Sequence, residues 1–222
     1  MPLSPLSLVS SLRRYGAAFG LALALTGCAS LSSPPVPEAG PLVVRHYHDN
    51  IALAGRMSIR YTQNDQEQAL HGSFTWDQDA SHIVMHLLSP LGQTLATIDI
   101  RPGIAVLQQS GKAPLSATDI NLLTEQALGW PLPISGLRDW LQGFGRTTAG
   151  QAFIAQPSTE VRNYDSADGW KLSYGEWQDD GANTAQNHPK RLDLSRQTRQ
   201  AGPVAIRIVI DKWQLPAAAG KS

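Results

Sequence analysis

Few side chains in this sequence have the types and spacings that catalysis or metal binding requires. The chain holds six histidines and one cysteine. His82 and His86 stand four positions apart, but the residues around them alternate as in a strand, where that spacing does not form the helical pair of a zinc site. There is no Gly-x-Ser-x-Gly elbow and no phosphate-binding glycine loop, and the acidic pair Asp179-Asp180 belongs to a loop. We therefore expect no catalytic residues, no metal and no cofactor, and infer that the protein is not an enzyme.

The single cysteine, Cys28, has chemistry of another kind, because it ends a segment with the layout of a secretory leader. Arg13-Arg14 supply positive charge, and an apolar run from Tyr15 to Leu25 follows. This run is far short of the about 20 residues that a helix needs to cross a bilayer, which favours a cleaved signal over residues 1–27. The small pair Thr26-Gly27 before the cysteine resembles the lipobox of bacterial lipoproteins, whose cysteine is acylated and becomes the first mature residue. The alternative is an ordinary signal peptide with an incidental cysteine.

The position after the cysteine bears on where such a lipoprotein would be kept. In the resemblance to enterobacterial lipoproteins, an aspartate there would retain the protein at the inner membrane, whereas this chain has Ala29. The resemblance therefore implies a lipid anchor in the inner leaflet of the outer membrane, with the protein at its periplasmic face. The chain has no second thiol for a disulfide in that oxidising compartment.

Composition divides the rest of the chain into three parts. Residues 28–48 include a Pro- and Ser-rich stretch that is typical of an extended spacer and cannot form a packed core. Residues 49–215 are enough for one domain with a real core, and residues 216–222 are a flexible tail. The formal net charge is zero, and no stretch is dense in Lys or Arg, so we expect no nucleic-acid partner.

The domain is predicted to be mainly β, because apolar and polar residues alternate along most of it. Alternation of this kind is what a half-buried antiparallel sheet requires. Turn-forming residues separate consecutive runs at short spacing, which indicates a meander instead of a βαβ fold. The predicted strands include 57–61, 70–76, 83–88, 93–100, 104–108, 170–174 and 204–210.

Two short helices are predicted to interrupt the strands. The first follows the capping residues of 116–119, carries one apolar stripe from Ile120 to Leu128, and ends at Gly129. The second begins at Ser135 and ends at Gly143, with Leu137, Trp140 and Leu141 on one face. Together these patterns predict a curved antiparallel sheet with a small helical insertion, an α+β arrangement.

Six short pieces of the domain occur in an order that resembles the LolB family, the outer-membrane lipoprotein receptors of Gram-negative bacteria. The pieces are Gly55-Arg56, Gly72-Ser73-Phe74-Thr75-Trp76, Ser89-Pro90-Leu91-Gly92, Leu128-Gly129-Trp130-Pro131-Leu132-Pro133, Leu137-Arg138-Asp139-Trp140-Leu141-Gln142-Gly143 and Asp211-Lys212-Trp213. The resemblance implies an unclosed antiparallel β-barrel with a small helical lid, enclosing an apolar cavity for acyl chains. It also implies that lipoproteins arrive from the periplasmic carrier LolA and are released into the outer membrane. The polar stretch 179–187 departs from the pattern as a longer surface loop.

Leu91 is the sharpest candidate for a functional side chain. It lies in a turn between Pro90 and Gly92, where polar residues are usual. A leucine held in water forgoes roughly 1.5–3 kcal/mol of burial, which is easier to understand if the tip enters a bilayer or a partner's groove. The alternative is that Leu91 folds back onto the sheet. In the resemblance, this loop carries a protruding apolar residue used for membrane delivery.

Large apolar residues on the strand and helix faces are candidates for contacts with acyl chains. A cavity is an unfilled core, so the same residues also fit an ordinary packed interior. In the resemblance, the helical residues among them belong to the lid. The candidates are Met57, Ile59, Phe74, Trp76, Met85, Leu137, Trp140, Trp170 and Tyr174.

These observations leave two main hypotheses for the function. The first is a monomeric receptor that takes lipoproteins from LolA, holds their acyl chains and inserts them into the membrane. The second is a structural or assembly lipoprotein of an envelope complex, with a solid core and an exposed interaction patch. A lipoprotein hydrolase is a remote third, because the sequence offers no nucleophile motif.

Overall fold

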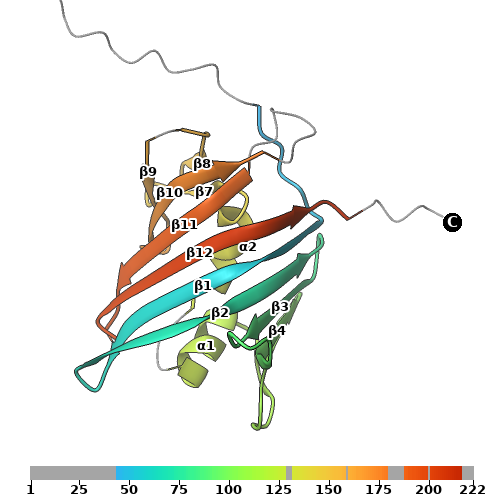
Figure 1. Cartoon of the computed structure of the whole chain (residues 1–222), viewed down its shortest axis with the longest axis vertical. Coiled ribbons are helices and arrows are strands. Elements are labelled where there is room, and N and C mark those ends of the chain that lie inside the picture. Colours follow the sequence, from blue (N-terminus) through green and yellow to red (C-terminus); the bar gives the residue numbers. More distant parts are fainter. Residues whose placement is uncertain (1–43, 129–131, 159, 180–187, 200, 217–222) are drawn as a thin grey trace, which may run out of the picture. The chain divides into compact units, whose positions relative to one another are not determined.

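Most of the described chain forms one large antiparallel sheet that curves without closing (Figure 1). The structure is a computed structural model, and it describes residues 44–128, 132–158, 160–179, 188–199 and 201–216. The predicted leader, Cys28 and the greater part of the predicted spacer lie outside these residues, as do Gly129, most of the 179–187 loop and the end of the predicted tail. The order of the strands in the sheet is β6-β5-β4-β3-β2-β1-β12-β11-β10-β9, and every neighbouring pair is antiparallel.

The described elements are twelve strands and two helices, and β7 and β8 form a separate two-stranded ribbon. The strands are β1 (Ile51–Gln63), β2 (Gln66–Gln78), β3 (Ile83–Leu88), β4 (Thr94–Arg101), β5 (Ile104–Gln109), β6 (Leu115–Ala117), β7 (Phe144–Arg146), β8 (Ala152–Ile154), β9 (Arg162–Asp165), β10 (Lys171–Gln178), β11 (His188–Gln197) and β12 (Pro203–Gln214). The helices are α1 (Ile120–Leu128) and α2 (Ile134–Trp140).

The predicted fold class is confirmed. The domain is mostly β, and two short helices accompany its large antiparallel sheet, as the alternation pattern predicted. The sheet is unclosed, as the resemblance implied. All seven predicted strands are present, with β1 and β2 much longer than predicted. The prediction missed β11 and the short strands β6, β7, β8 and β9. Gly143, where the second helix was expected to end, has a left-handed φ of 80°, and the residues that follow it form β7.

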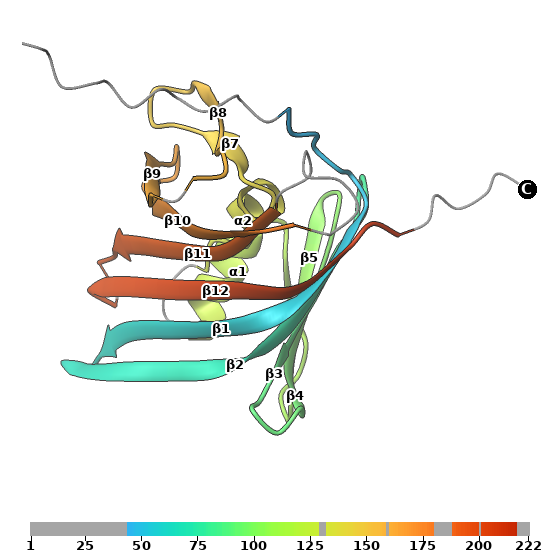
Figure 2. The ribbon, with the colours of Figure 1, turned by 45° about the horizontal axis from the view of Figure 1, so that its top comes forward.

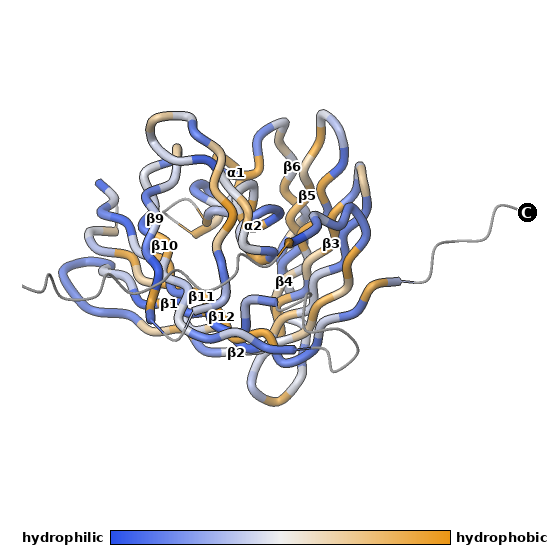
Figure 3. Tube along the Cα trace, turned by 90° about the horizontal axis from the view of Figure 1, so that it is seen from above, coloured by the Kyte–Doolittle hydropathy of each residue, from blue (hydrophilic) through white to orange (hydrophobic). Residues whose placement is uncertain are grey.

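Both helices lie inside the curve of the sheet, as the view from above shows (Figure 3). Asp119 begins α1 by accepting hydrogen bonds on its Oδ1 from the backbone N–H of Asn121 at 2.7 Å and of Leu122 at 3.4 Å. Ser116 and Ala117, which were expected to help in capping, belong instead to β6. Helix α2 begins one residue earlier than predicted, after Pro133, and no side chain caps it.

The β1–β2 hairpin is built on a two-residue turn. Asn64 and Asp65 have φ values of 51° and 58°, and Gln63 pairs with Gln66. A turn with two left-handed residues matches the twist of the strands, and Asn and Asp tolerate that conformation better than most residues. The pairing then continues without a bulge to Ile51 and Gln78. The other side of β1 pairs with β12, so the first and last strands of the domain are neighbours.

The core lies on the concave side of the sheet, where inward-facing residues of the strands and those of α1 and α2 form one buried cluster. Trp76 and Trp170 are fully buried there, and the Tyr174 hydroxyl donates a hydrogen bond to the Trp140 carbonyl at 3.0 Å. Gly136 lets the Trp140 ring lie flat on α2, because a Cβ at this position would be 2.4 Å from the ring. The half of the interior next to α2 is therefore tightly packed.

Candidate functional site

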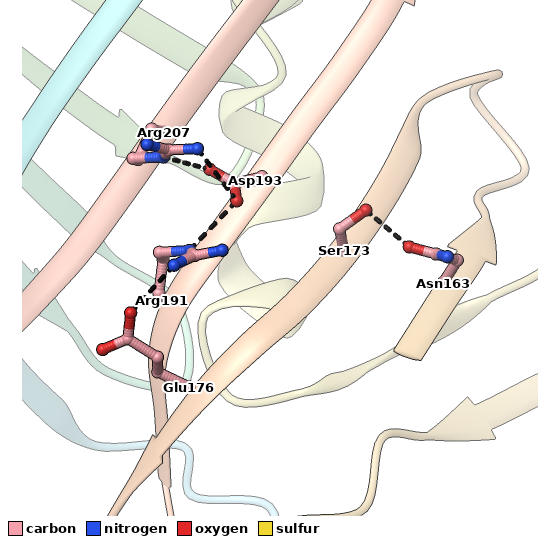
Figure 4. A network of polar contacts seen from close by, with 6 residues as sticks. All are labelled: Asn163, Ser173, Glu176, Arg191, Asp193 and Arg207. Atoms are coloured by element: carbon pink, nitrogen blue, oxygen red, sulfur yellow. Dashed lines mark hydrogen bonds and ion pairs between the residues drawn. The ribbon is translucent and has the colours of Figure 1, made fainter. Parts of the chain in front are cut away.

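The convex face of the sheet is polar. Asp193 accepts from the Arg207 Nε at 2.6 Å and from the Arg191 Nε at 3.1 Å, and Arg191 also pairs with Glu176 at 2.8 Å (Figure 4). Two depressions on this face, of about 460 and 510 Å³, are both lined in part by Arg207. Charged walls of this kind do not suit hydrocarbon, because desolvating the ions costs more than the contacts return.

An apolar pocket of about 200 Å³ lies on the concave side. It is lined by the middle parts of β1 and β2, by the end of β3 and the start of β4, and by the last residues of β5 and α1. Its floor includes Met57, Ile59 and Ala96, which are buried, and its mouth includes Leu70 and Leu95, whose side chains are 49% and 50% exposed. The remaining residues that line it are His71, Gly72, Ser73, Leu87, Leu88, Gln109 and Leu128. A pocket with leucines at its mouth suits an apolar ligand that enters from solvent.

Only part of the predicted cavity lies at this pocket. Met57 and Ile59 line it. The other seven candidates, Phe74, Trp76, Met85, Leu137, Trp140, Trp170 and Tyr174, are at most 3% exposed and belong to the packed core. Their contact with acyl chains stays a prediction, and in the described structure they contact one another and the sheet.

Sequence reasoning missed the leucines that line the pocket. Leu87 and Leu88 are consecutive, so they cannot both face the core of a regular strand, and a register shift between them accompanies the end of β3. Leu70 begins a predicted strand whose later residues are buried, although it is itself half exposed. The available signal was the alternation itself, because Leu70 keeps the inward phase of its strand at a position where the packed core has ended.

The turn between β3 and β4 holds Leu91 out of the sheet. Ser89 closes it by donating from its N–H to the Gln93 carbonyl at 2.8 Å and accepting from the Gly92 N–H at 2.8 Å. Gly92 has a φ of 81°, which a residue with a side chain rarely adopts. Leu91 is 88% exposed, more than any other large apolar residue of the described chain. The structure places Pro90, Leu91 and Gly92 on the same hairpin as the pocket residues Leu88 and Leu95.

An N-terminal strap, residues 44–50, packs against the end of the domain that holds β7 and β8, although residues up to 48 were expected to be spacer. The Arg45 guanidinium donates to the carbonyls of Gln142 at 2.6 Å and Ala155 at 2.8 Å, and it lies 4.8 Å from the Trp177 ring centroid. Burial lowers the pKa of Arg45 to about 10, which still leaves it a cation at neutral pH. Two hydrogen bonds join the Gln142 side chain to the backbone of His48, at 2.9 and 3.0 Å.

The histidines that stood four apart have separate partners. His82 immediately precedes β3, and its Nε2 is 3.0 Å from Asp99 of β4. His86 pairs with Thr97 across β3 and β4, and its Nδ1 is 3.0 Å from the Thr97 hydroxyl. Among the described residues, no group of three His, Cys, Asp or Glu side chains is arranged to hold a metal ion. Within the same part of the chain, neither helix has the length and apolar composition of a membrane span.

Comparison with known proteins gives a consistent result. The family model for outer membrane lipoprotein LolB matches residues 49–213. A protein of Cupriavidus pinatubonensis named outer-membrane lipoprotein LolB is 35% identical over 201 residues, which cover 89% of this chain and 93% of that protein. The protein of the same name from Ralstonia nicotianae is 36% identical over 203 residues, covering 87% and 93% of the two chains.

The protein of this name from Bordetella parapertussis is 40% identical over 140 residues, covering 63% of this chain and 67% of that protein. Among solved structures, a LolA superfamily protein of Nitrosomonas europaea has 8% sequence identity and a TM-score of 0.47, covering 79% of this chain and 90% of that one.

Proposed function

The chain belongs to the LolB family of outer-membrane lipoproteins, and from this premise we propose that it is a receptor for lipoproteins at the periplasmic face of the outer membrane. In this proposal, Cys28 carries the acyl chains that anchor the protein. Lipoproteins arrive from the periplasmic carrier LolA, their acyl chains enter the concave side of the sheet, and they leave into the inner leaflet of the membrane.

The observation that carries the proposal is a single hairpin that joins an apolar pocket to an exposed apolar tip. Strands β3 and β4 supply Leu87, Leu88 and Leu95 to the pocket, and their turn holds Leu91 in solvent. Acyl chains gain about 0.8 kcal/mol for each methylene removed from water, so a transfer protein must keep them covered from one site to the next. Because the pocket and the exposed apolar tip belong to the same hairpin, the path of an acyl chain from the pocket to the membrane is short.

The pocket must enlarge to hold an acyl chain. Its volume of about 200 Å³ is below the roughly 300–1,000 Å³ that is usual for ligand pockets. Helix α1, which supplies Leu128, has nine residues, so its stability depends on packing and not on its own hydrogen bonds. We infer that an entering chain displaces α1 and the leucines at the mouth, while the packed half next to α2 stays in place.

The alternative, an assembly lipoprotein with a solid core, finds its own support in the packing of Trp76, Trp170 and Tyr174. Binding of a fluorescent fatty acid, followed by transfer from lipoprotein-loaded LolA, separates the two functions. Leu95→Asp, at the mouth of the pocket, should weaken both processes, because a carboxylate is costly to cover with hydrocarbon.

Ile154→Asp on β8 is the matched control, because Ile154 is 46% exposed, lies outside the pocket and should tolerate the change. If the wild-type chain binds no fatty acid and takes no lipoprotein from LolA, the receptor proposal is wrong and the assembly function is favoured.

A further inference from the structure

Strand β2 has a long stretch of free edge beside the apolar pocket. From Gln66 to Gly72 it pairs with β1 on one side, whereas β3 pairs only with residues Ser73–Gln78. No strand among the described residues occupies the other side of Gln66–Gly72. Figure 2 shows β2 continuing past the point where β3 and β4 turn away.

Gly72 stands where the two strands separate. A Cβ at this position would be 2.3 Å from the Leu88 carbonyl oxygen, so only glycine permits this close approach of the backbones. Beyond it, the β3–β4 hairpin leaves the sheet and no longer covers the edge. The separation is therefore built into the sequence at Gly72.

The register of the β1–β2 hairpin fixes which backbone groups face the free side. A two-residue turn closes on a hydrogen-bonded pair, here Gln63 and Gln66, and bonded and non-bonded pairs alternate along an antiparallel ladder. Bonds to β1 therefore come from Gln68, Leu70 and Gly72. The N–H and C=O groups of Glu67, Ala69 and His71 point away from β1, toward the free side.

This edge lacks the devices that normally prevent pairing with another chain. Exposed edges are usually protected by proline, lysine, a bulge or a covering element. From Gln66 to Gly72 there is no proline and no lysine, the register is continuous, and Glu67 is the one acidic residue. An unprotected edge of this length is a site for the addition of a strand.

We propose that the edge of β2 from Gln66 to Gly72 binds the extended peptide that follows the acylated cysteine of a lipoprotein, as an added antiparallel strand. This inference rests on the proposed receptor function and adds a peptide site to the acyl site. The two sites are continuous, because Leu70 and Gly72 of the edge also line the pocket. A cysteine whose acyl chains fill the pocket therefore starts its peptide near Gly72 and runs toward Gln66, opposite to β2.

The chemistry of a lipoprotein's first residues fits this edge. In this chain the residues after Cys28 are Ala29-Ser30-Leu31-Ser32-Ser33, and the first proline is Pro34. Each of the five residues before Pro34 has a backbone N–H, and none is charged. Backbone pairing does not depend on side chains, so one edge serves lipoproteins of different sequence.

The probe for the test is a dipalmitoyl-cysteine peptide with the sequence of residues 28–33 and a fluorophore at its carboxyl end. The comparison probe has the same lipid and sequence, with methyl groups on its backbone nitrogens. The protein is the full chain with Cys28→Ala, which lacks its own acyl chains. We expect the methylated probe to bind at least tenfold more weakly, because several edge hydrogen bonds are lost.

The protein variants are Ala69→Pro and its control Ala69→Thr. Proline at position 69 removes an N–H that faces the free side and leaves the bonds to β1, so the melting temperature should change little. Ala69→Pro should bind the unmethylated probe as weakly as the methylated one, whereas Ala69→Thr should bind it normally. Hydrogen exchange at Glu67, Ala69 and His71 should slow with the lipopeptide and not with palmitate.

Three results would overturn the inference. If the two probes bind equally and Leu95→Asp still weakens the binding of both, the acyl site is real and the edge has no role. If neither probe nor palmitate binds, the receptor function fails together with the edge site. If the chain without ligand is a dimer whose edge amides are already protected, the edge belongs to a second copy of this chain.

Discussion

Replacing Leu91 by glutamate should separate folding from membrane delivery. At 88% exposure the side chain has little burial to lose, and Gly92, not Leu91, adopts the left-handed conformation of the turn. The free energy of unfolding should therefore change by less than about 0.5 kcal/mol. Binding of a fluorescent fatty acid should also stay near the wild-type value, because Leu91 does not line the pocket.

Delivery into the membrane should respond strongly to the same change. A leucine gains about 0.5 kcal/mol on entering a membrane interior, whereas an acidic residue costs about 2.5–3.5 kcal/mol. A difference of about 3 kcal/mol corresponds to roughly a 100-fold loss of delivery. The assay loads the purified chain with a labelled lipoprotein, mixes it with liposomes and measures the label that floats with the lipid.

Ile104→Glu is the matched control for this experiment. Ile104 is 47% exposed and follows the β4–β5 turn, at the other end of β4 from Leu91. If only the β3–β4 tip enters the bilayer, this variant should deliver normally. Delivery by Leu91→Glu at the wild-type rate, or equal losses for the two variants, would refute the membrane role of Leu91.

Three further predictions concern the anchor and the packed core. Mass spectrometry of the mature protein should find Cys28 as the first residue and carrying acyl chains, and an intact leader or a free thiol there would contradict the lipoprotein assignment. Gly136→Ala should lower the free energy of unfolding in urea by about 1–3 kcal/mol, because the new Cβ meets the Trp140 ring at 2.4 Å, although alanine favours a helix; an unchanged midpoint would mean that the ring moves freely. Burial raises the pKa of the Tyr174 phenol, so its stabilising effect is complete below about pH 10, where unfolded tyrosine titrates, and decreases above that pH. Tyr174→Phe should therefore cost about 1 kcal/mol at pH 7, where the Trp140 carbonyl loses its donor, and less at pH 11, and a deficit that does not depend on pH would contradict this reasoning.

Local patterns in the sequence predicted most of the strands, because a half-buried strand repeats every two residues. Strand β11 escaped prediction because only Leu192 and Leu194 mark its inward face among charged neighbours such as Arg191 and Asp193. Strands β7 and β8 have three residues each, too few for a periodic pattern. Their existence depends on pairing with each other, which no local sequence pattern specifies.

Of the candidate site, only the apolar tip could be predicted, because its conformation depends on the turn-forming residues next to it in the sequence. The sequence Pro90-Leu91-Gly92 was enough to expect an apolar tip, because the two flanking residues define the turn. The pocket was not predictable, because inward-facing residues such as Ile59 and Trp76 follow the same pattern whether the space before them is filled or empty. The burial of Arg45 could not be predicted either. Its hydrogen-bond partners are the backbone carbonyls of Gln142 and Ala155, and every residue has a backbone carbonyl, so no residue type marks these partners.

The pairing of β1 with β12 determines when the sheet can be completed. Arg56 and Asp211, which bond across this pair, are 155 positions apart in the sequence. The β1–β2 hairpin closes through two residues and can form early, whereas β1 acquires its other neighbour only after the last strand of the domain has been synthesised. Until then the edge of β1 opposite β2 also stays unpaired, which exposes the incomplete chain to aggregation. A truncation that removes β12 should therefore leave two incomplete half-sheets that cannot join.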